Sequence, residues 1–304
     1  MTKIVQNTAR KILEELYSAN FQLHPLQSAT SDVFLTEFHD GSEPVLIKIP
    51  RATNEEAIRE QRVVDALESI HIPVPPVLCT QENKPVGSLV YTVFRYIRGP
   101  SIREVVAWND ERTQRTFAQI GELALQLSRV SPAMVPEALT AEEVQAQELQ
   151  WWEDHNPWIA RHRGTTRLLE YIWHAARGIL LVPPTVFGHR DGVQVVSDGA
   201  RVHLIDAGSA GANWPDADYA RLIYGGYAWY GGEEHKVWRE ATQQAYFEGR
   251  TPTDADVERI LILMAFYAIR EAAIYSSTDR NRHVDYMYHL AEMFLVEGKK
   301  WFGR

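Results

Sequence analysis

The sequence predicts an α+β fold with an N-terminal antiparallel sheet, one key helix beside that sheet, and a mostly helical C-terminal lobe. Strand-forming runs flank an Asp-Gly turn at Asp40-Gly41 and again at Asp198-Gly199, and Asp-Gly between such runs is a strong hairpin signal. The dipeptide Gly99-Pro100 then separates a strand-rich segment from a helix-rich one. We therefore divide the chain into an N-terminal lobe, residues 1–98, and a C-terminal lobe, residues 99–304.

Composition and charge narrow the class of protein. The 304 residues are 45% hydrophobic, which is enough for a sizeable core, and their apolar runs are shorter than the roughly 20 residues of a membrane span. A single cysteine, Cys79, excludes an intrachain disulfide and suits a reducing cytoplasm. The net charge of −9 opposes binding to nucleic acid and suits a cationic small molecule better. We expect a cytoplasmic protein without membrane or nucleic-acid partners, and the oligomeric state stays open.

A lysine interrupts an apolar strand in the N-terminal lobe. After a predicted helix at 7–19, the runs Asp32–His39 and Val45–Ile49 form the first predicted hairpin. Lys48 lies in the return strand, and burying an unpaired ammonium group is costly. The lysine therefore either points outward from an edge strand or meets an acidic partner.

The next element supplies such a partner. A Thr53-x-x-Glu56 capping box opens a helix predicted at 54–68. Glu60 falls on the apolar face of this helix, at helical spacing with Ala57, Val64 and Leu67. A carboxylate on that face needs a cation, and Lys48 on the preceding strand is the natural candidate.

Helical periodicity dominates the rest of the chain. A strand predicted at 87–97 ends the sheet, and the Gly-Pro boundary follows. Apolar residues at helical spacing and capping signals then predict helices at 111–129, from 140 through Trp151-Trp152, at 166–179, from 216 onward, at 234–248, at 254–275 and at 280–301.

Two carboxylates bracket the second predicted hairpin. If Ser197 faces Arg201, then Gly192 faces Asp206, and the side chains of Asp191 and Asp206 meet at the open end of the hairpin. Two acidic groups held together bind a divalent cation, or act as a base and a metal ligand. The alternative is that Asp191 caps a turn and Asp206 only ends a strand.

Three motifs carry a family resemblance. They are Phe187-Gly188-His189-Arg190-Asp191, then Leu204-Ile205-Asp206-Ala207-Gly208, then Asp216-Ala217-Asp218. In this order, behind a strand lysine and a helix glutamate, they resemble the aminoglycoside phosphotransferase and choline kinase family of small-molecule kinases. The resemblance implies a two-lobed protein-kinase-like fold and phosphorylation of a small-molecule hydroxyl.

The same resemblance implies ATP and Mg²⁺ as cofactors and assigns the site residues. Asp191, with His189 on the same loop, would be catalytic and receive the proton of the acceptor hydroxyl, while Asp206 would hold Mg²⁺. Nucleotide contacts would come from Lys48, oriented by Glu60, from the hydroxyl of Ser31 near the phosphates, and from the hinge residues Arg95, Tyr96 and Ile97 at the adenine.

The sequence departs from the family pattern at three places. Val196 stands where the family has a metal-binding asparagine, and Gln194 is the nearest amide. The predicted phosphate-covering turn, residues 26–32, contains no glycine, and Ala207 replaces a frequent aromatic residue. Two alternatives therefore stay open: a degenerate kinase that binds a nucleotide or metabolite without transferring phosphate, and a helical interaction protein in which the motif is accidental.

Acidic and aromatic residues in the helical lobe suggest where an acceptor binds. Glu148, Trp152 and Glu153 cluster in one predicted helix, and Asp216 begins another. Carboxylates among aromatic rings suit an ammonium group, so we expect a cationic small-molecule acceptor there. The alternative is that the tryptophans pack in the core and the acids face water.

Overall fold

The computed structural model describes residues 3–26, 31–51, 54–86, 89–100, 102–162, 167–191, 194–230, 236–277 and 283–303. The chain divides into two compact units. Unit 1 consists of Met1–Gly99 and Val196–Gly208, and unit 2 of Pro100–Val195 and Ser209–Arg304. The hairpin that carries Asp206 thus groups with the N-terminal residues, which a division at residue 98 alone does not capture.

Unit 1 is built on a five-stranded antiparallel sheet in the order β1-β2-β3-β5-β4. The strands are β1 (Phe21–Leu26), β2 (Ser31–Phe38), β3 (Val45–Pro50), β4 (Val77–Thr80) and β5 (Thr92–Arg95). The predicted hairpin is β2-β3, in which Val33 pairs with Lys48. The last strand is shorter than predicted, and residues 87 and 88 of that prediction lie outside the described residues.

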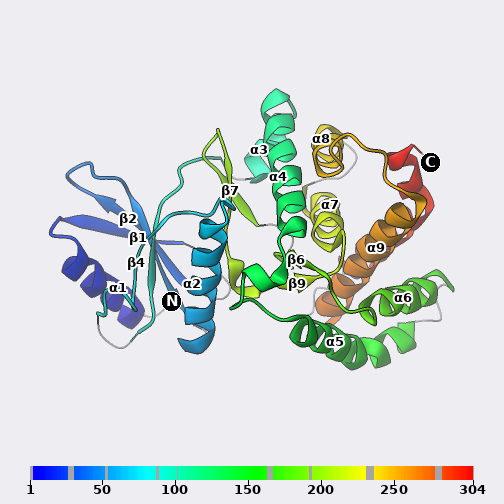
Figure 1. Cartoon of the computed structure of the whole chain (residues 1–304), viewed down its shortest axis with the longest axis horizontal. Coiled ribbons are helices and arrows are strands. Elements are labelled where there is room, and N and C mark those ends of the chain that lie inside the picture. The colour runs from blue at the N-terminus through cyan, green and yellow to red at the C-terminus, as the bar shows by residue number, and fades with distance from the viewer. Residues whose placement is uncertain are drawn as a thin grey trace. The chain divides into compact units, whose positions relative to one another are not determined.

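Two helices cover opposite faces of this sheet (Figure 1). Side chains alternate along β3, so Val45, Ile47 and Ile49 point into the core that α1 (Lys3–Leu16) closes. Lys48 must therefore point to the other face, toward α2 (Asn54–Ser69). The predicted capping box of α2 includes residues outside the described chain.

A second hairpin belongs to unit 1. It joins β7 (Val195–Ser197) to β8 (Val202–Leu204), and the amide of Asp198 donates to the carbonyl of Arg201 over 3.1 Å. The turn therefore pairs Asp198 with Arg201, one residue along from the predicted pairing of Ser197 with Arg201. The amide of Leu204 donates to the carbonyl of Pro73 over 2.7 Å, which ties β8 to the extended segment before β4.

Unit 2 is mostly helical, as predicted. Its helices are α3 (Ile102–Trp108), α4 (Glu111–Arg129), α5 (Ala141–His162), α6 (Arg167–Leu180), α7 (Ala217–Tyr230), α8 (Lys236–Tyr246), α9 (Asp254–Ser277) and α10 (Val284–Glu297), and its short strands are β6 (Val186–Gly188) and β9 (Gly211–Asn213). The apolar helix α9 packs against α10, α7 and α6. Among the helices of the described chain, we find none with the length and hydropathy of a membrane span. The predicted α+β fold, with a sheet followed by helices, is confirmed.

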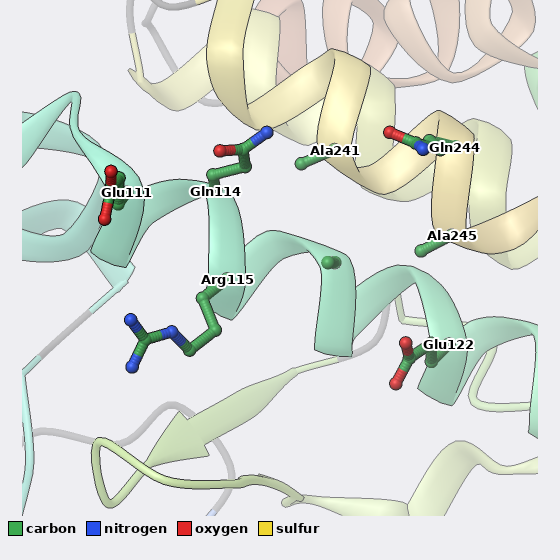
Figure 2. Close-up of a pocket in the computed structure, with 8 residues that line it drawn as sticks. Glu111, Gln114, Arg115, Glu122, Ala241, Gln244 and Ala245 are labelled. Atoms are coloured by element: carbon green, nitrogen blue, oxygen red, sulfur yellow. The ribbon is translucent and has the colours of Figure 1, made fainter.

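Small side chains let α4 and α8 pack closely. Ala118 of α4 and Ala241 and Ala245 of α8 line the seam, and Figure 2 shows Ala241 and Ala245 directed at α4. The seam opens into a surface hollow of about 520 Å³ with Glu111, Arg115 and Glu122 on its α4 side. Its lining contains none of the site residues predicted from the sequence.

The close approach of Gly99 to the β7-β8 hairpin yields a first prediction. A Cβ atom at Gly99 would lie 1.6 Å from the carbonyl oxygen of Ser197. Gly99→Ala should therefore push the hairpin away and lower the free energy of unfolding by about 1 to 3 kcal/mol, measured by urea denaturation. Gly178→Ala is the control, because a Cβ atom there meets nothing within 4 Å and should stabilise α6 by about 0.5 to 1 kcal/mol. Equal stability of the Gly99 variant and the wild type would contradict the contact.

Candidate active site

Three charged side chains meet in unit 1. The Nζ atom of Lys48 lies 2.5 Å from Oε1 of Glu60 and 2.9 Å from Oδ1 of Asp206. The side chains of Lys48 and Glu60 are only 15% and 16% exposed. The predicted pairing of Lys48 with Glu60 is present, and Asp206 is a second acidic partner that the sequence did not indicate.

The environment of Lys48 keeps its charge. Burial by itself would lower the pKa of the ammonium group, but the adjacent carboxylates of Glu60 and Asp206 oppose this and raise the pKa above its ordinary value. Lys48 is therefore a partly desolvated cation whose position is fixed by the carboxylates of Glu60 and Asp206. Such a cation is suited to binding an anionic group such as a phosphate.

Asp206 is held in an unusual backbone conformation. It follows β8 with a φ of 58°, in the left-handed region that Asp tolerates better than most residues. Its side chain is 40% exposed, so the carboxylate is accessible to a ligand. Among the described residues, no group of three or more His, Cys, Asp or Glu is placed to hold a metal ion. Magnesium that arrives with phosphates needs only one or two carboxylates, and Asp206 fits that role.

The predicted nucleotide contacts at the hinge are partly occupied. The amide of Arg95 donates to the carbonyl of Pro76 over 2.9 Å, and the amide of Tyr96 donates to the carbonyl of Pro44 over 3.2 Å. These two amides are therefore not available to adenine. Ile97 has no backbone hydrogen bond within the part of the chain that the structure describes, so any adenine contact from a hinge amide falls to it.

Two other predicted ligand positions have less definite surroundings. Ser31 begins β2 opposite Pro50 and is buried, while the neighbouring residues 27–30 of the predicted phosphate-covering turn lie outside the described chain. Gln194 is exposed just before β7. It belongs to unit 2 and Asp206 to unit 1, so the second metal ligand stays a prediction.

The loop that carries Asp191 is anchored by a buried carboxylate of unit 2. Asp218, in the first turn of α7, accepts the amide of His189 over 2.6 Å and the amide of Arg190 over 2.9 Å. Its Oδ1 also accepts Nδ2 of Asn213 over 3.0 Å. Arg190 has a φ of 69°, a conformation that needs such support. These contacts fix the backbone immediately before Asp191.

Gly188 makes this anchoring possible. A Cβ atom there would lie 2.4 Å from Nδ2 of Asn213 and 2.7 Å from Oδ2 of Asp218. Burial raises the pKa of Asp218, and His189 together with the two loop amides opposes that rise. The arrangement therefore holds the carboxyl group of Asp218 against the loop without exposing it to water.

The structure separates the two residues predicted to be catalytic. His189 is fully buried, and its predicted catalytic role stays a prediction. Asp191 is exposed. The hydroxyl of Ser209 donates to Oδ2 of Asp191, and Nη2 of Arg221 lies 3.7 Å from Oδ1. Asp191 and Asp206 belong to different units, so their predicted meeting stays a prediction.

Most of the predicted acceptor residues are already engaged. Glu148 accepts from Arg190 and Arg270 over 3.1 and 2.7 Å. Trp152 is buried and stacks on Trp173, which is the core-packing alternative.

The remaining two predicted acceptor residues differ from each other. The side chain of Asp216 accepts from Arg259 and from the hydroxyl of Tyr246, the latter over 2.8 Å. That carboxylate lies 3.0 Å from Nε of Arg259, so the guanidinium group of Arg259 balances its negative charge. Glu153 is exposed on α5. Of the four predicted acceptor residues, it is the one whose side chain faces solvent.

Sequence reasoning missed four residues of this site. Asp218 was recognised only as part of a motif, although an acid in the first turn of an apolar helix is a detectable signal. Arg221 lies three residues after Asp218 on α7 and so shares its face. Ser209 and Arg270 gave no signal, because nothing in a single sequence connects them to Asp191 or Glu148.

Comparison with known proteins agrees with this geometry. The model of the phosphotransferase enzyme family matches residues 22–256, more than half of the chain. No curated protein sequence matches significantly.

Solved structures share the fold. The GDP complex of an aminoglycoside 2'-phosphotransferase is 11% identical with a TM-score of 0.65, and covers 98% of this chain and 99% of that chain. A microcompartment-associated aminopropanol kinase is 16% identical with a TM-score of 0.60, covering 95% and 97%. An aminoglycoside phosphotransferase from Streptomyces rimosus, in complex with ADP and streptomycin, is 20% identical with a TM-score of 0.58, covering 87% and 98%. Identities of this size show a common fold, and with it the predicted kinase-like architecture is confirmed.

The ion pair between Lys48 and Glu60 is open to a direct test. Removing one partner of a buried pair typically costs about 3 to 5 kcal/mol, because the other charge is left uncompensated. Lys48→Met and Glu60→Gln should each destabilise unit 1, and the double variant should lose less than the sum of the two. Urea denaturation of the four proteins measures the coupling. Strict additivity would show that the two side chains do not interact in solution.

Asp218 should stabilise the loop through its two acceptor oxygens. Asn in its place keeps one acceptor and loses the other, so one buried loop amide is left unsatisfied at a cost of about 1 to 3 kcal/mol. We expect Asp218→Asn to lower the free energy of unfolding by that amount. Asp285→Asn, at an exposed position on α10, is the matched control. A loss of stability as small as that of the control would remove the anchoring role.

Proposed function

Because the chain belongs to the phosphotransferase enzyme family, we propose that it transfers the γ-phosphoryl group of ATP to a hydroxyl group of a small molecule. The observation that carries this proposal is the Lys48 ammonium held between the carboxylates of Glu60 and Asp206. A fixed cation beside an accessible carboxylate can bind phosphate oxygens and a phosphate-bound metal ion together. Neither an interaction surface nor a purely structural sheet needs this arrangement.

Each residue then has a specific task. Lys48 binds phosphate oxygens and Glu60 fixes its orientation. Asp206 is the protein ligand for Mg²⁺, which when bound supplies positive charge to the phosphates as their negative charge shifts. Such a reaction depends on positioning and charge neutralisation more than on a strong nucleophile.

Asp191 is the proposed base for the acceptor hydroxyl. Its Oδ2 already accepts a hydrogen bond from the hydroxyl of Ser209, which is the same contact that an acceptor hydroxyl would make. The loop beneath it is fixed through Asp218, so the carboxylate does not have to be ordered when the acceptor binds. A base positioned in this way contributes about 10²- to 10⁴-fold to the rate.

The first test is ADP release by the purified protein, supplied with Mg²⁺ and ATP, against pooled hydroxyl-bearing metabolites and antibiotics. We expect release with at least one pool and none after the metal is chelated. Nucleotide binding without release in any pool would support the alternative, a degenerate kinase that binds without transfer. That alternative is motivated by Val196 at the asparagine position and by the glycine-free turn at 26–32.

Substitution of the base should separate binding from transfer. Asp191→Asn should lower kcat by about 10²- to 10⁴-fold and leave ATP affinity nearly unchanged, because the side chain contacts the acceptor and not the nucleotide. Asp206→Asn should instead weaken Mg²⁺-dependent nucleotide binding, which titration calorimetry measures. Asp285→Asn serves again as the exposed control. Turnover at the wild-type rate in Asp191→Asn would exclude this residue as the base.

A further inference from the structure

Three arginines of unit 2 are connected to the loop that carries the proposed base. Arg190 precedes Asp191 on the loop, Arg221 comes from α7 and Arg270 from α9. We call Arg190, Arg221 and Arg270 the arginine cluster. Glu148 of α5 bridges Arg190 and Arg270, and Nη1 of the third member, Arg221, donates to the carbonyl of Arg190 over 2.8 Å.

Two members of the arginine cluster, Arg221 and Arg270, lie over aromatic rings of α9 and α5. The guanidinium carbon of Arg221 lies 5.3 Å from the ring centre of Tyr267, and that of Arg270 lies 4.7 Å from the ring centre of Trp151. Tyr267 and Arg270 are three residues apart on α9 and therefore share one face of that helix. Charge on Arg221, Glu148 and Arg270 acts on the same tyrosine hydroxyl, so these groups lie together around it.

Glu148 already has two cationic partners. One carboxylate oxygen accepts from Arg190 and the other from Arg270, and the side chain is only 13% exposed. An incoming amine would therefore meet a partly desolvated carboxylate whose negative charge two guanidinium groups already balance. The ring of Trp152 is not available to a cationic acceptor either, because this residue is buried and Arg177 already lies 5.0 Å from its ring centre.

Arg221 is arranged differently from the other two. Its side chain is 27% exposed, and its Nη2 is 3.7 Å from Oδ1 of Asp191, which is beyond hydrogen-bond distance. Within the described chain its one hydrogen bond goes to the Arg190 carbonyl. A planar guanidinium fixed by a carbonyl and an aromatic ring, with its Nη2 facing Asp191 but not hydrogen-bonded to it, is a preorganised partner for a carboxylate or phosphate.

From this arrangement we infer that the acceptor is an anionic alcohol, in which Arg221 and Arg270 bind a carboxylate or phosphate while Asp191 takes the proton of a hydroxyl close by. The inference rests on the proposed function for the transfer step, but the anion site itself does not. It reverses the expectation of a cationic acceptor, which depended partly on Glu148 and Asp216, two acids that the structure pairs with arginines. Since Arg221 lies so near Asp191, the anionic group and the hydroxyl must be separated by only a few bonds.

The transfer step balances without a further reactant. The acceptor O–H bond breaks as Asp191 takes its proton, the acceptor oxygen forms a bond to the γ-phosphorus of ATP, and the bond from that phosphorus to the β-phosphate oxygen breaks, releasing ADP. Arg221 and Arg270 stay protonated throughout and act on binding and orientation only.

A matched series of acceptors tests the charge preference. Glycerate, glycerol phosphate, glycerol and aminopropanediol share a three-carbon skeleton and differ in charge, and gluconate, glucose and glucosamine repeat the comparison on six carbons. ADP release gives kcat and KM for each compound, and calorimetry gives affinity in the absence of ATP. We expect the highest kcat/KM for an anionic member. Comparison of glycerate with glycerol phosphate identifies which anion the site takes.

Substitution of Arg221 shows whether the cluster is responsible. Arg221→Gln keeps a hydrogen-bonding side chain and loses the charge, so KM for the anionic acceptor should rise about 10- to 100-fold while KM for the neutral analogue changes little. Arg221→Lys should recover part of the loss, which a merely structural role would not predict. Arg129→Gln is the matched control, because Arg129 is exposed and pairs with Glu248 on the surface.

The outcomes separate this inference from the proposed function. Phosphorylation that prefers a cationic or neutral acceptor, unaffected by Arg221→Gln, would overturn the inference and leave the phosphotransferase function intact. Binding of hydroxycarboxylates that Arg221→Gln abolishes, with no ADP release from any compound, would keep the anion site and overturn the function. If no anionic compound is either bound or turned over, the inference is overturned.

Discussion

The buried ammonium group of Lys48 is the charge that the organisation of unit 1 depends on. Alternation along β3 puts its neighbours in the core and leaves Lys48 on the face toward α2. There it needs compensation, which comes from Glu60 on α2 and from Asp206 after β8. Buried ion pairs add little net stability compared with apolar packing. Lys48 and its acidic partners are therefore better explained by what the ammonium group binds than by a contribution to stability.

Unit 2 also contains a buried ionisable group with fixed partners, here an acid in place of a lysine. Asp218 is a buried carboxylate whose compensation comes from loop amides and Asn213. Because amides are fixed to the backbone, this pairing orders a loop, whereas the pairing of Lys48 orders side chains. The exposed Asp191 is then displayed on a rigid support, and its freedom is limited by Ser209 and Arg221. In both units a buried charge is satisfied so that an adjacent accessible carboxylate can act.

The sequence predicted what local periodicity encodes. The spacing of apolar residues on α2 assigned Glu60 to the inward face, and the Asp-Gly turns located both hairpins. The register of the second hairpin was wrong by one residue, because an Asp-Gly signal locates a turn without fixing which residues pair across it. The two ion pairs of Glu148 were not predicted, for a different reason. Its partners Arg190 and Arg270 lie 42 and 122 residues away in the chain, and no local pattern reports such pairs.

The net charge of the chain is compatible with the inferred anionic acceptor for a related physical reason. The −9 of the whole chain is spread over its surface, and at physiological ionic strength charges separated by more than about 8 Å are largely screened from one another. A small acceptor therefore responds to the groups it touches. Next to Asp191 lies the guanidinium group of Arg221, and the acid Glu148 is already bound to Arg190 and Arg270. Acidic composition and the local preference for anions that we infer from the arginine cluster are thus compatible in one protein.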